Sequence, residues 1–205
     1  IDTVNFNFCG IKAYVNSRRG IRMIGKAVIC YAVAIFLAQA AHCDDIPRYN
    51  RDLFGGWSDA DQDCQNTRHE LLQEASTGAI SLSNNTCRVT RGRWLDPYTG
   101  KIFFESWQVD IDHLVPLKYA WDRGAHSWAT LKRAQFSNDT ANLFVVQKSV
   151  NRQKSAYGPS VWLPPSLKFR CQYILRFQRI IRKYSLKQSA AELRLIRTAQ
   201  QQHCG

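Results

Sequence analysis

The pair Asp112-His113 and the block at 151–154, Asn-Arg-Gln-Lys, hold the side chains best suited to chemistry on a phosphodiester. Asp112 is a hard oxygen donor that suits magnesium or manganese, and Asn151 offers an amide oxygen to the same ion. His113 belongs to a residue type with an ordinary pKa of about 6.5, so it can accept a proton from water at neutral pH. Hydrolysis of a phosphodiester needs such a base and a cation on the departing oxygen. The pattern therefore predicts His113 as general base and Asp112 and Asn151 as metal ligands.

Four further residues near this set have expected roles. Lys154 and Arg152 lie within one helical turn of Asn151, where their charges could hold phosphate oxygens. Asn142 is better placed to tie the loop or orient His113 than to touch the ion. Asp110 precedes Asp112 by two residues, so both point to one side of a strand. Asp110 is either a supporting carboxylate behind the site or a lone surface acid, and the sequence leaves both open.

The expected elements place this set on a strand, a loop and a helix. An extended stretch at 108–114 leads into the Asp-His pair, a strand covers 142–146, and a helix covers 149–155. We expect short helices at 117–123 and 129–136. Upstream, acidic residues at 59–63 are expected to open a helix through Ala75, followed by strands at 87–94 and 101–105 around the turn at 96–100. Downstream, apolar residues from Leu167 to Tyr184 at spacings of three and four predict an amphipathic helix, and Ser189 begins a last helix.

The charge of the chain is unevenly distributed. Residues 148–205 carry twelve Lys and Arg against Glu192 alone, whereas residues 41–147 carry 11 against 14 acidic residues. The basic half, residues 148–205, is suited to bind a polyanion, and the more acidic half, residues 41–147, is suited to bind a metal ion. The alternative is that a basic helical surface merely keeps the protein in solution.

The N-terminal region has the features of a secretory signal. Met23 to Lys26 is short and basic, an apolar stretch follows to Leu37, and the next three residues fit a cleavage site after Ala40. We therefore expect residues 1–22 to be upstream sequence, 23–40 a signal peptide, and 41–205 a single domain that is secreted or periplasmic and has no membrane segment after cleavage.

Export makes disulfides plausible for the five cysteines that remain after such a cut. Sequence alone does not fix their pairing, but proximity along the chain favours Cys64–Cys87 and Cys171–Cys204. The second pair would also meet across two antiparallel helices. Cys43 is then left over, close to the new N-terminus.

Several blocks together resemble the HNH endonucleases of the ββα-metal class, and among them a secreted family related to the C-terminal nuclease domain of GmrSD-type restriction enzymes. The resemblance spans about residues 48–204, and its blocks are Asp110 to Leu117, Ala120-Trp121, Asn138-Asp139, Asn142-Leu143, Asn151 to Lys154 and Trp162 to Pro165. It implies an α+β fold with a central ββα-metal (HNH) finger, flanking helices and a β-hairpin, stapled by disulfides.

The same resemblance implies an endonuclease that cuts DNA with low sequence specificity by one-metal hydrolysis, leaving a 5′-phosphate. His113 would be the base, Asp112 and Asn151 the ligands of Mg²⁺ or Mn²⁺, and Asn142 the supporting residue. Asn151 stands where the family name has its final histidine, which favours these ions over zinc or nickel. We expect a monomer, with RNA as a further possible substrate. The alternatives are a non-catalytic extracellular nucleic-acid-binding protein and a nuclease toxin.

Overall fold

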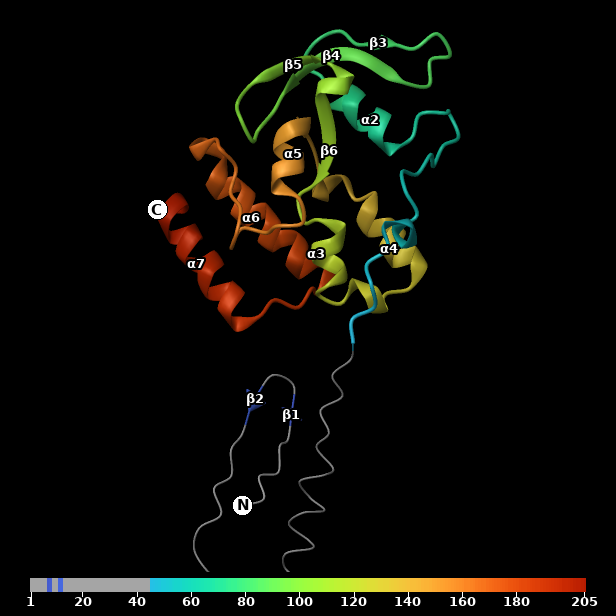
Figure 1. Cartoon of the computed structure of the whole chain (residues 1–205). Helices are drawn as coiled ribbons and strands as arrows, with labels where there is room; N and C mark the ends of the chain where they lie inside the picture. Colours follow the sequence, from blue (N-terminus) through green and yellow to red (C-terminus); the bar gives the residue numbers. More distant parts are fainter. Residues whose placement is uncertain (1–6, 9–10, 13–44) are drawn as a thin grey trace, which may run out of the picture. The chain divides into compact units, whose positions relative to one another are not determined.

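The computed structural model describes residues 7–8, 11–12 and 45–205 (Figure 1). The chain divides into two compact units, residues 1–46 and 47–205. In the first unit, β1 (Asn7–Phe8) and β2 (Ile11–Lys12) pair antiparallel. The signal peptide expected at 23–40 lies outside the described residues. Every residue of the predicted site lies in the second unit.

The second unit is a mixed α and β structure, which confirms the expected α+β class. In chain order its elements are η1 (Arg51–Phe54), α2 (Thr67–Glu74), β3 (Ser81–Leu82), β4 (Val89–Leu95), β5 (Ile102–Glu105), η2 (Ser106–Gln108), β6 (Val109–His113), α3 (Leu117–Trp121), η3 (Ala125–Ser127), α4 (Thr130–Ser137), η4 (Thr140–Asn142), β7 (Leu143–Gln147), α5 (Lys148–Lys154), α6 (Leu167–Tyr184) and α7 (Ala190–Cys204).

A strand–strand–helix unit lies at the centre of this domain. Strands β6 and β7 pair antiparallel, with Asp112 opposite Phe144 and His113 opposite Leu143. Helix α5 follows β7 without a loop and packs on both strands (Figure 1). These three elements follow one another in the chain as strand, strand and helix, and whether they form the expected HNH finger stays a prediction. The end of β6 and the side of α5 are thereby brought together.

Strand β6 runs from one hydrophobic core to the other. Val109 and Ile111 belong to a smaller core with residues of α2, β4 and β7. Leu114 and Val115, directly after the strand, belong to a larger core with α3, α4, α6 and α7. Because close-packed cores hold their side chains in fixed positions, the residues between these anchors are held firmly at both ends.

A three-stranded antiparallel sheet, β3-β4-β5, covers the smaller core. The turn between β4 and β5 is fixed by Asp96, whose buried carboxylate accepts hydrogen bonds from the Tyr98 amide at 2.8 Å and the Thr99 hydroxyl at 2.5 Å. This turn was predicted, and it delivers Tyr98 into the interior, where its side chain is fully buried. Strand β3 was not predicted.

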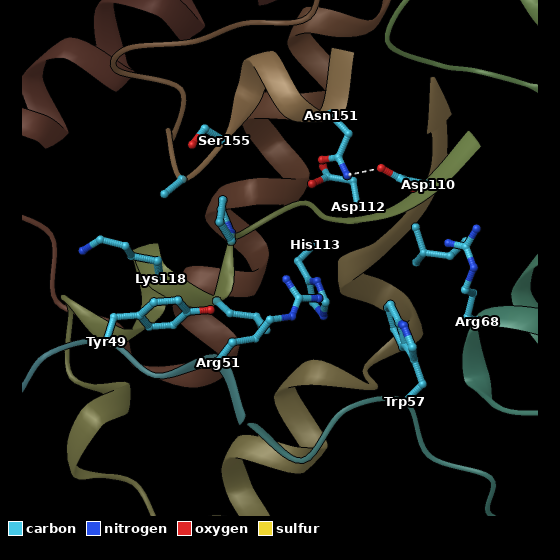
Figure 2. Close-up of a pocket in the computed structure, with 14 residues that line it drawn as sticks. Tyr49, Arg51, Trp57, Arg68, Asp110, Asp112, His113, Lys118, Asn151 and Ser155 are labelled. Carbon is cyan, nitrogen blue, oxygen red and sulfur yellow. Dashed lines mark hydrogen bonds between the residues drawn. The ribbon is translucent and has the colours of Figure 1, made fainter. Parts of the chain in front are cut away.

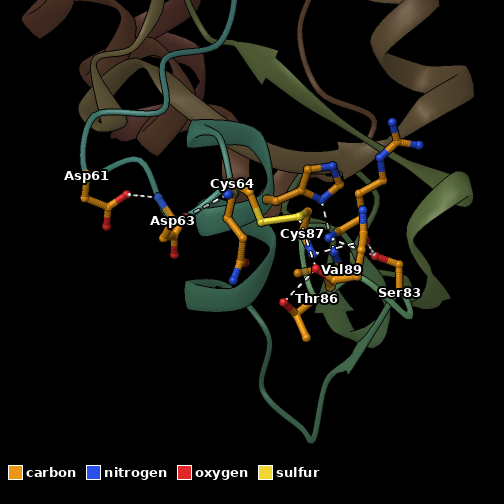
Figure 3. The surroundings of a disulfide bond; sticks show 11 residues. Asp61, Asp63, Cys64, Ser83, Thr86, Cys87 and Val89 are labelled. Atoms are coloured by element: carbon orange, nitrogen blue, oxygen red, sulfur yellow. Dashed lines mark hydrogen bonds between the residues drawn. A yellow bond between two sulfur atoms is a disulfide. The ribbon is translucent and has the colours of Figure 1, made fainter.

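The helix expected to open at 59–63 instead begins at Thr67. The acidic residues before this helix form local turns instead. The Asp61 carboxylate accepts from the Asp63 amide at 3.3 Å, and the Asp63 carboxylate accepts from the Gln65 amide at 2.7 Å (Figure 3). Cys64 follows with a positive φ of 73° and forms a disulfide with Cys87. Side-chain bonds to nearby amides compete with the helix, which explains the later start.

Helices α6 and α7 form an antiparallel pair clipped by the disulfide Cys171–Cys204. The buried side of α6 carries Ile174, Phe177 and Ile181, as its apolar spacing predicted, although Leu167 at its start is exposed. Ser189 caps α7 by accepting from the Glu192 amide at 3.1 Å. Both predicted disulfides are confirmed. Within the described residues, no helix has the length and apolar character needed to cross a membrane.

Candidate active site

A cavity of about 650 Å³ opens beside the end of β6 and contains four of the predicted site residues: Asp110, Asp112, His113 and Asn151 (Figure 2). The first three come from β6 and the fourth from α5. Their convergence follows from the antiparallel pairing of β6 with β7 and the immediate start of α5 after β7. The structure brings these four predicted residues to one cavity, while their chemical roles stay predictions.

His113 is buried and fixed on one edge. Its Nε2 lies 2.8 Å from the carbonyl oxygen of Ser137. Because a carbonyl can only accept, Nε2 carries the proton and Nδ1 keeps a lone pair. No hydrogen bond from the described residues engages Nδ1. The ring stacks on Trp57 with centroids 5.4 Å apart and planes 10° from parallel.

Burial lowers the pKa of His113 from 6.5 to about 3, against the effect of the hydrogen bond to Ser137, and the charges of Arg51 and Lys154 lower it further. The imidazole is therefore neutral at physiological pH. Its free nitrogen can accept a proton, which is the requirement for a general base.

Asp112 is almost fully buried at the floor of the cavity. Its Oδ1 accepts from Lys154 Nζ at 2.9 Å, and its Oδ2 accepts from the Tyr98 hydroxyl at 2.5 Å. Burial raises the pKa of the Asp112 carboxyl, while Lys154 and Tyr98 act in the opposite direction. Burial likewise lowers the pKa of Lys154, and Asp112 opposes that shift. The carboxylate orientation is thus set by two partners on the protein side.

Asn151 and Asp110 both line this cavity and lie next to each other. Asn151 Nδ2 lies 3.5 Å from Asp110 Oδ2, a long contact (Figure 2). If Asn151 donates its amide nitrogen to Asp110, its amide oxygen remains for another partner. Of the two roles left open for Asp110, this placement favours the supporting carboxylate over the lone surface acid.

Asn142 lies behind the site and ties the loop that follows His113. Its side chain accepts from the Val115 amide at 2.8 Å and donates to the Val115 carbonyl at 3.2 Å, and its backbone carbonyl accepts from the Leu114 amide at 2.8 Å. It is fully buried and does not line the cavity. This is the loop-tying role expected for Asn142.

The two residues expected to hold phosphate do not line the cavity. Lys154 is fully buried, and its ammonium donates to Asp112 and, at 2.8 Å, to the carbonyl oxygen of His113. These bonds speak against phosphate binding and make Lys154 a residue that positions Asp112. Arg152 is exposed on α5. The helical spacing gives the position of Lys154 on α5 but not which way the buried face of α5 turns, so its burial could not be predicted; its role in phosphate binding stays a prediction.

The cavity is also lined by cationic and aromatic side chains that the sequence did not predict there: Arg51, Trp57, Arg68 and Lys118, with Tyr49. Arg68 donates to the Val109 carbonyl at 3.3 Å, and Lys118 pairs with Asp122 at 2.7 Å. Tyr49, Arg51, Trp57 and Arg68 lie far from His113 in the sequence, whereas Lys118 directly follows the Asp110 to Leu117 block. Only the folded chain shows their position.

The donor set fits a hard divalent cation. Asp112 and Asn151, with Asp110 beside Asn151, bring carboxylate and amide oxygens to the same cavity, and these are the ligand types that magnesium and manganese prefer. Each carboxylate oxygen of Asp112 has one protein partner and can still accept a second, because it has two lone pairs.

Comparisons with known proteins identify the family. The family model described as GmrSD restriction endonucleases, C-terminal domain, matches residues 65–199. A protein of Arthroderma benhamiae described as an uncharacterized secreted protein is 37% identical over 146 residues, covering 70% of this chain and 70% of that protein. No solved structure matches. The chain belongs to the family of GmrSD restriction endonuclease C-terminal domains, as its sequence blocks indicated, and this membership supports a nuclease acting on nucleic acid.

Proposed function

We propose that this protein is an exported, metal-dependent HNH endonuclease that hydrolyses phosphodiester bonds of DNA with low sequence specificity. One observation carries the proposal: the lone pair of His113 Nδ1 is left free at the same cavity in which Asp112 and Asn151 present oxygen ligands. The strand–strand–helix unit of β6, β7 and α5 supports the ββα-metal subclass.

In the proposed reaction, His113 Nδ1 takes a proton from a water molecule, and the hydroxide so formed attacks phosphorus. The bond from phosphorus to the 3′ oxygen breaks, and that oxygen takes up a proton from solvent, leaving a 5′-phosphate and a 3′-hydroxyl. A divalent cation held by Asp112 and Asn151 would supply a Lewis acid that neutralises charge on the departing oxygen.

The depressed pKa of His113 guarantees the neutral form but makes it a weak base. An anionic phosphate in the cavity would raise the pKa of the imidazole, whereas the proposed cation on Asp112 would lower it, so the two charges act in opposite directions. The hydrogen bond to Ser137 holds the ring in place throughout.

Export is supported by three observations: the signal-like segment at 23–40, the two disulfides, and the relative that is described as secreted. Disulfides persist in oxidising compartments. We propose a secreted or periplasmic monomer that uses Mg²⁺ or Mn²⁺ and prefers DNA to RNA.

The test uses the chain as secreted by an expression host, incubated with supercoiled plasmid and Mg²⁺ or Mn²⁺, with and without EDTA. We expect nicking and linearisation that EDTA abolishes, and a loss of about 10²- to 10⁴-fold in rate for His113→Ala. Intact plasmid under both ions would refute the enzyme, and a His113→Ala variant as fast as the parent would refute the site. N-terminal sequencing of the secreted form checks the cut after Ala40.

A further inference from the structure

The proposed nuclease needs a cation from the protein to hold its substrate phosphate, and the cavity offers three candidates from outside the central unit. Arg51 comes from η1, Arg68 from α2 and Lys118 from α3. Two of the three already have protein partners, since Arg68 donates to Val109 and Lys118 pairs with Asp122. Among the described residues, the Arg51 side chain has no ion pair or hydrogen bond, so its five donors remain for a ligand.

Arg51 is also the cation placed beside the proposed base. It lines the main cavity together with His113, and both residues line a second, smaller cavity of about 140 Å³ next to it. Figure 2 shows the Arg51 side chain reaching toward the His113 ring. A phosphate attacked by water next to His113 would therefore lie within reach of this guanidinium, which matches phosphate oxygens with two parallel donors.

The backbone that carries Arg51 is firmly anchored. The segment 47–58, called here the N-terminal strap, is held at Pro47 by Trp121 Nε1 at 2.7 Å and at Phe54 by the Ser137 hydroxyl at 2.7 Å. Asn138 closes its other end, accepting from the Ser58 amide at 2.9 Å and donating to the Gly56 carbonyl at 3.0 Å. The strap is thus part of the folded domain.

Two strap side chains reach the catalytic histidine from this fixed backbone. Phe54 is buried in the larger core and anchors η1, while Asn50 caps η1 by accepting from the Asp52 amide at 2.9 Å. Arg51 and Trp57 on either side of Phe54 line both cavities with His113. Ser137 links the strap directly to His113, because its hydroxyl donates to the Phe54 carbonyl and its own carbonyl accepts from His113 Nε2.

We propose that the N-terminal strap is part of the active site and that Arg51 binds the phosphate that is cut. The guanidinium then neutralises the charge that grows on the non-bridging oxygens when hydroxide adds. The strap precedes the residues that the family model matches, 65–199. This inference rests on the proposed function.

The test compares the full chain with Arg51→Gln, Arg51→Lys and Arg48→Gln on a labelled DNA duplex with Mg²⁺. Arg48 is the matched control, because it is an exposed arginine of the same strap that does not line the cavity. We expect Arg51→Gln to lower kcat/KM about 100-fold, through both a lower kcat and a raised KM, because the guanidinium would hold the bound phosphate and also the charge that develops on it. Arg51→Lys should recover about tenfold of this loss, since it keeps the charge but not the paired donors. Arg48→Gln should stay within about twofold of the parent.

A second arm measures binding without cleavage, with each substitution placed in a His113→Ala background. The duplex should bind more weakly to the Arg51→Gln protein than to the Arg48→Gln protein, with a shallower salt dependence. If the parent cuts and Arg51→Gln cuts equally well, the Arg51 assignment is wrong although the enzyme stands. If the parent cuts nothing, the proposed function has failed, and equal binding by the two variants would overturn the Arg51 assignment as well. Equal melting temperatures of all variants exclude a folding defect.

Discussion

At the scale of single residues, the site depends on which atoms have protein partners and which do not. His113 uses one nitrogen for Ser137 and keeps the other free, while Asp112 has both oxygens engaged from the protein side by Lys154 and Tyr98. Buried polar groups without partners are costly, so these bonds are what allow an acid and an imidazole to sit at the floor of a cavity.

The burial of neutral His113 predicts a pH-dependent stability in EDTA. Folded His113 takes up its proton near pH 3, whereas the unfolded chain does so near 6.5. The unfolded state therefore binds more protons between these values, and stability falls as pH drops through this window, by up to about 1.4 kcal/mol per pH unit. Urea denaturation at pH 7, 6 and 5 should show this loss for the parent, and His113→Gln should show a flatter dependence. Identical slopes would mean that His113 titrates normally in the fold.

Substitution of Lys154 distinguishes whether this residue positions Asp112 or binds phosphate. Lys154→Met leaves the Asp112 carboxylate buried without its ion-pair partner, so we expect a loss of about 3–5 kcal/mol in the free energy of unfolding. The double variant Lys154→Met/Asp112→Asn removes the unpaired charge and should recover part of that stability while remaining inactive. A Lys154→Met protein of parental stability and raised KM would instead support phosphate binding.

At the scale of elements, local patterns predicted most of the fold. The spacing of apolar residues by three and four predicted α6, and the Asp-Pro-Tyr-Thr-Gly stretch predicted the turn before β5. The Asp-His pair after an extended stretch predicted the end of β6. The start of α2 was wrong because Asp61 and Asp63 bond nearby amides in turns. The three residues predicted as base and metal ligands, Asp112, His113 and Asn151, line one cavity, but Arg51 and Arg68 were not predicted to lie there, since only tertiary packing brings them to it.

The disulfide Cys171–Cys204 stabilises the helix pair without touching the cavity. It closes a separation of 33 residues, for which the loss of chain entropy in the unfolded state gives about 4 kcal/mol. Cys171→Ser/Cys204→Ser should therefore lower the free energy of unfolding by about 2–5 kcal/mol and leave kcat nearly unchanged below its melting temperature. Differential scanning calorimetry and plasmid cleavage measure the two quantities. A large fall in kcat in the folded variant would show that the helix pair controls the site.

At the scale of the whole molecule, positive charge accumulates on the helices outside the central unit. Helix α6 contains no acidic residue, and its exposed Lys168, Arg179 and Arg182 fall on one face, within about 60° of one another at 100° per residue. A cationic helical face of this kind suits the backbone of a nucleic acid, whereas a face that only maintains solubility would have no specific partner.

The charge of this face is testable through the salt dependence of DNA binding. Each phosphate contact contributes about 0.9 to the slope of log K against log salt for B-DNA. In the His113→Ala background, the triple variant Lys168→Gln/Arg179→Gln/Arg182→Gln should reduce that slope by about 2–3 and weaken binding to all sequences alike. In the active protein it should raise KM and leave kcat unchanged, because none of the three lines the cavity. An unaltered slope and KM would show that DNA does not reach this face and that its charge serves solubility alone.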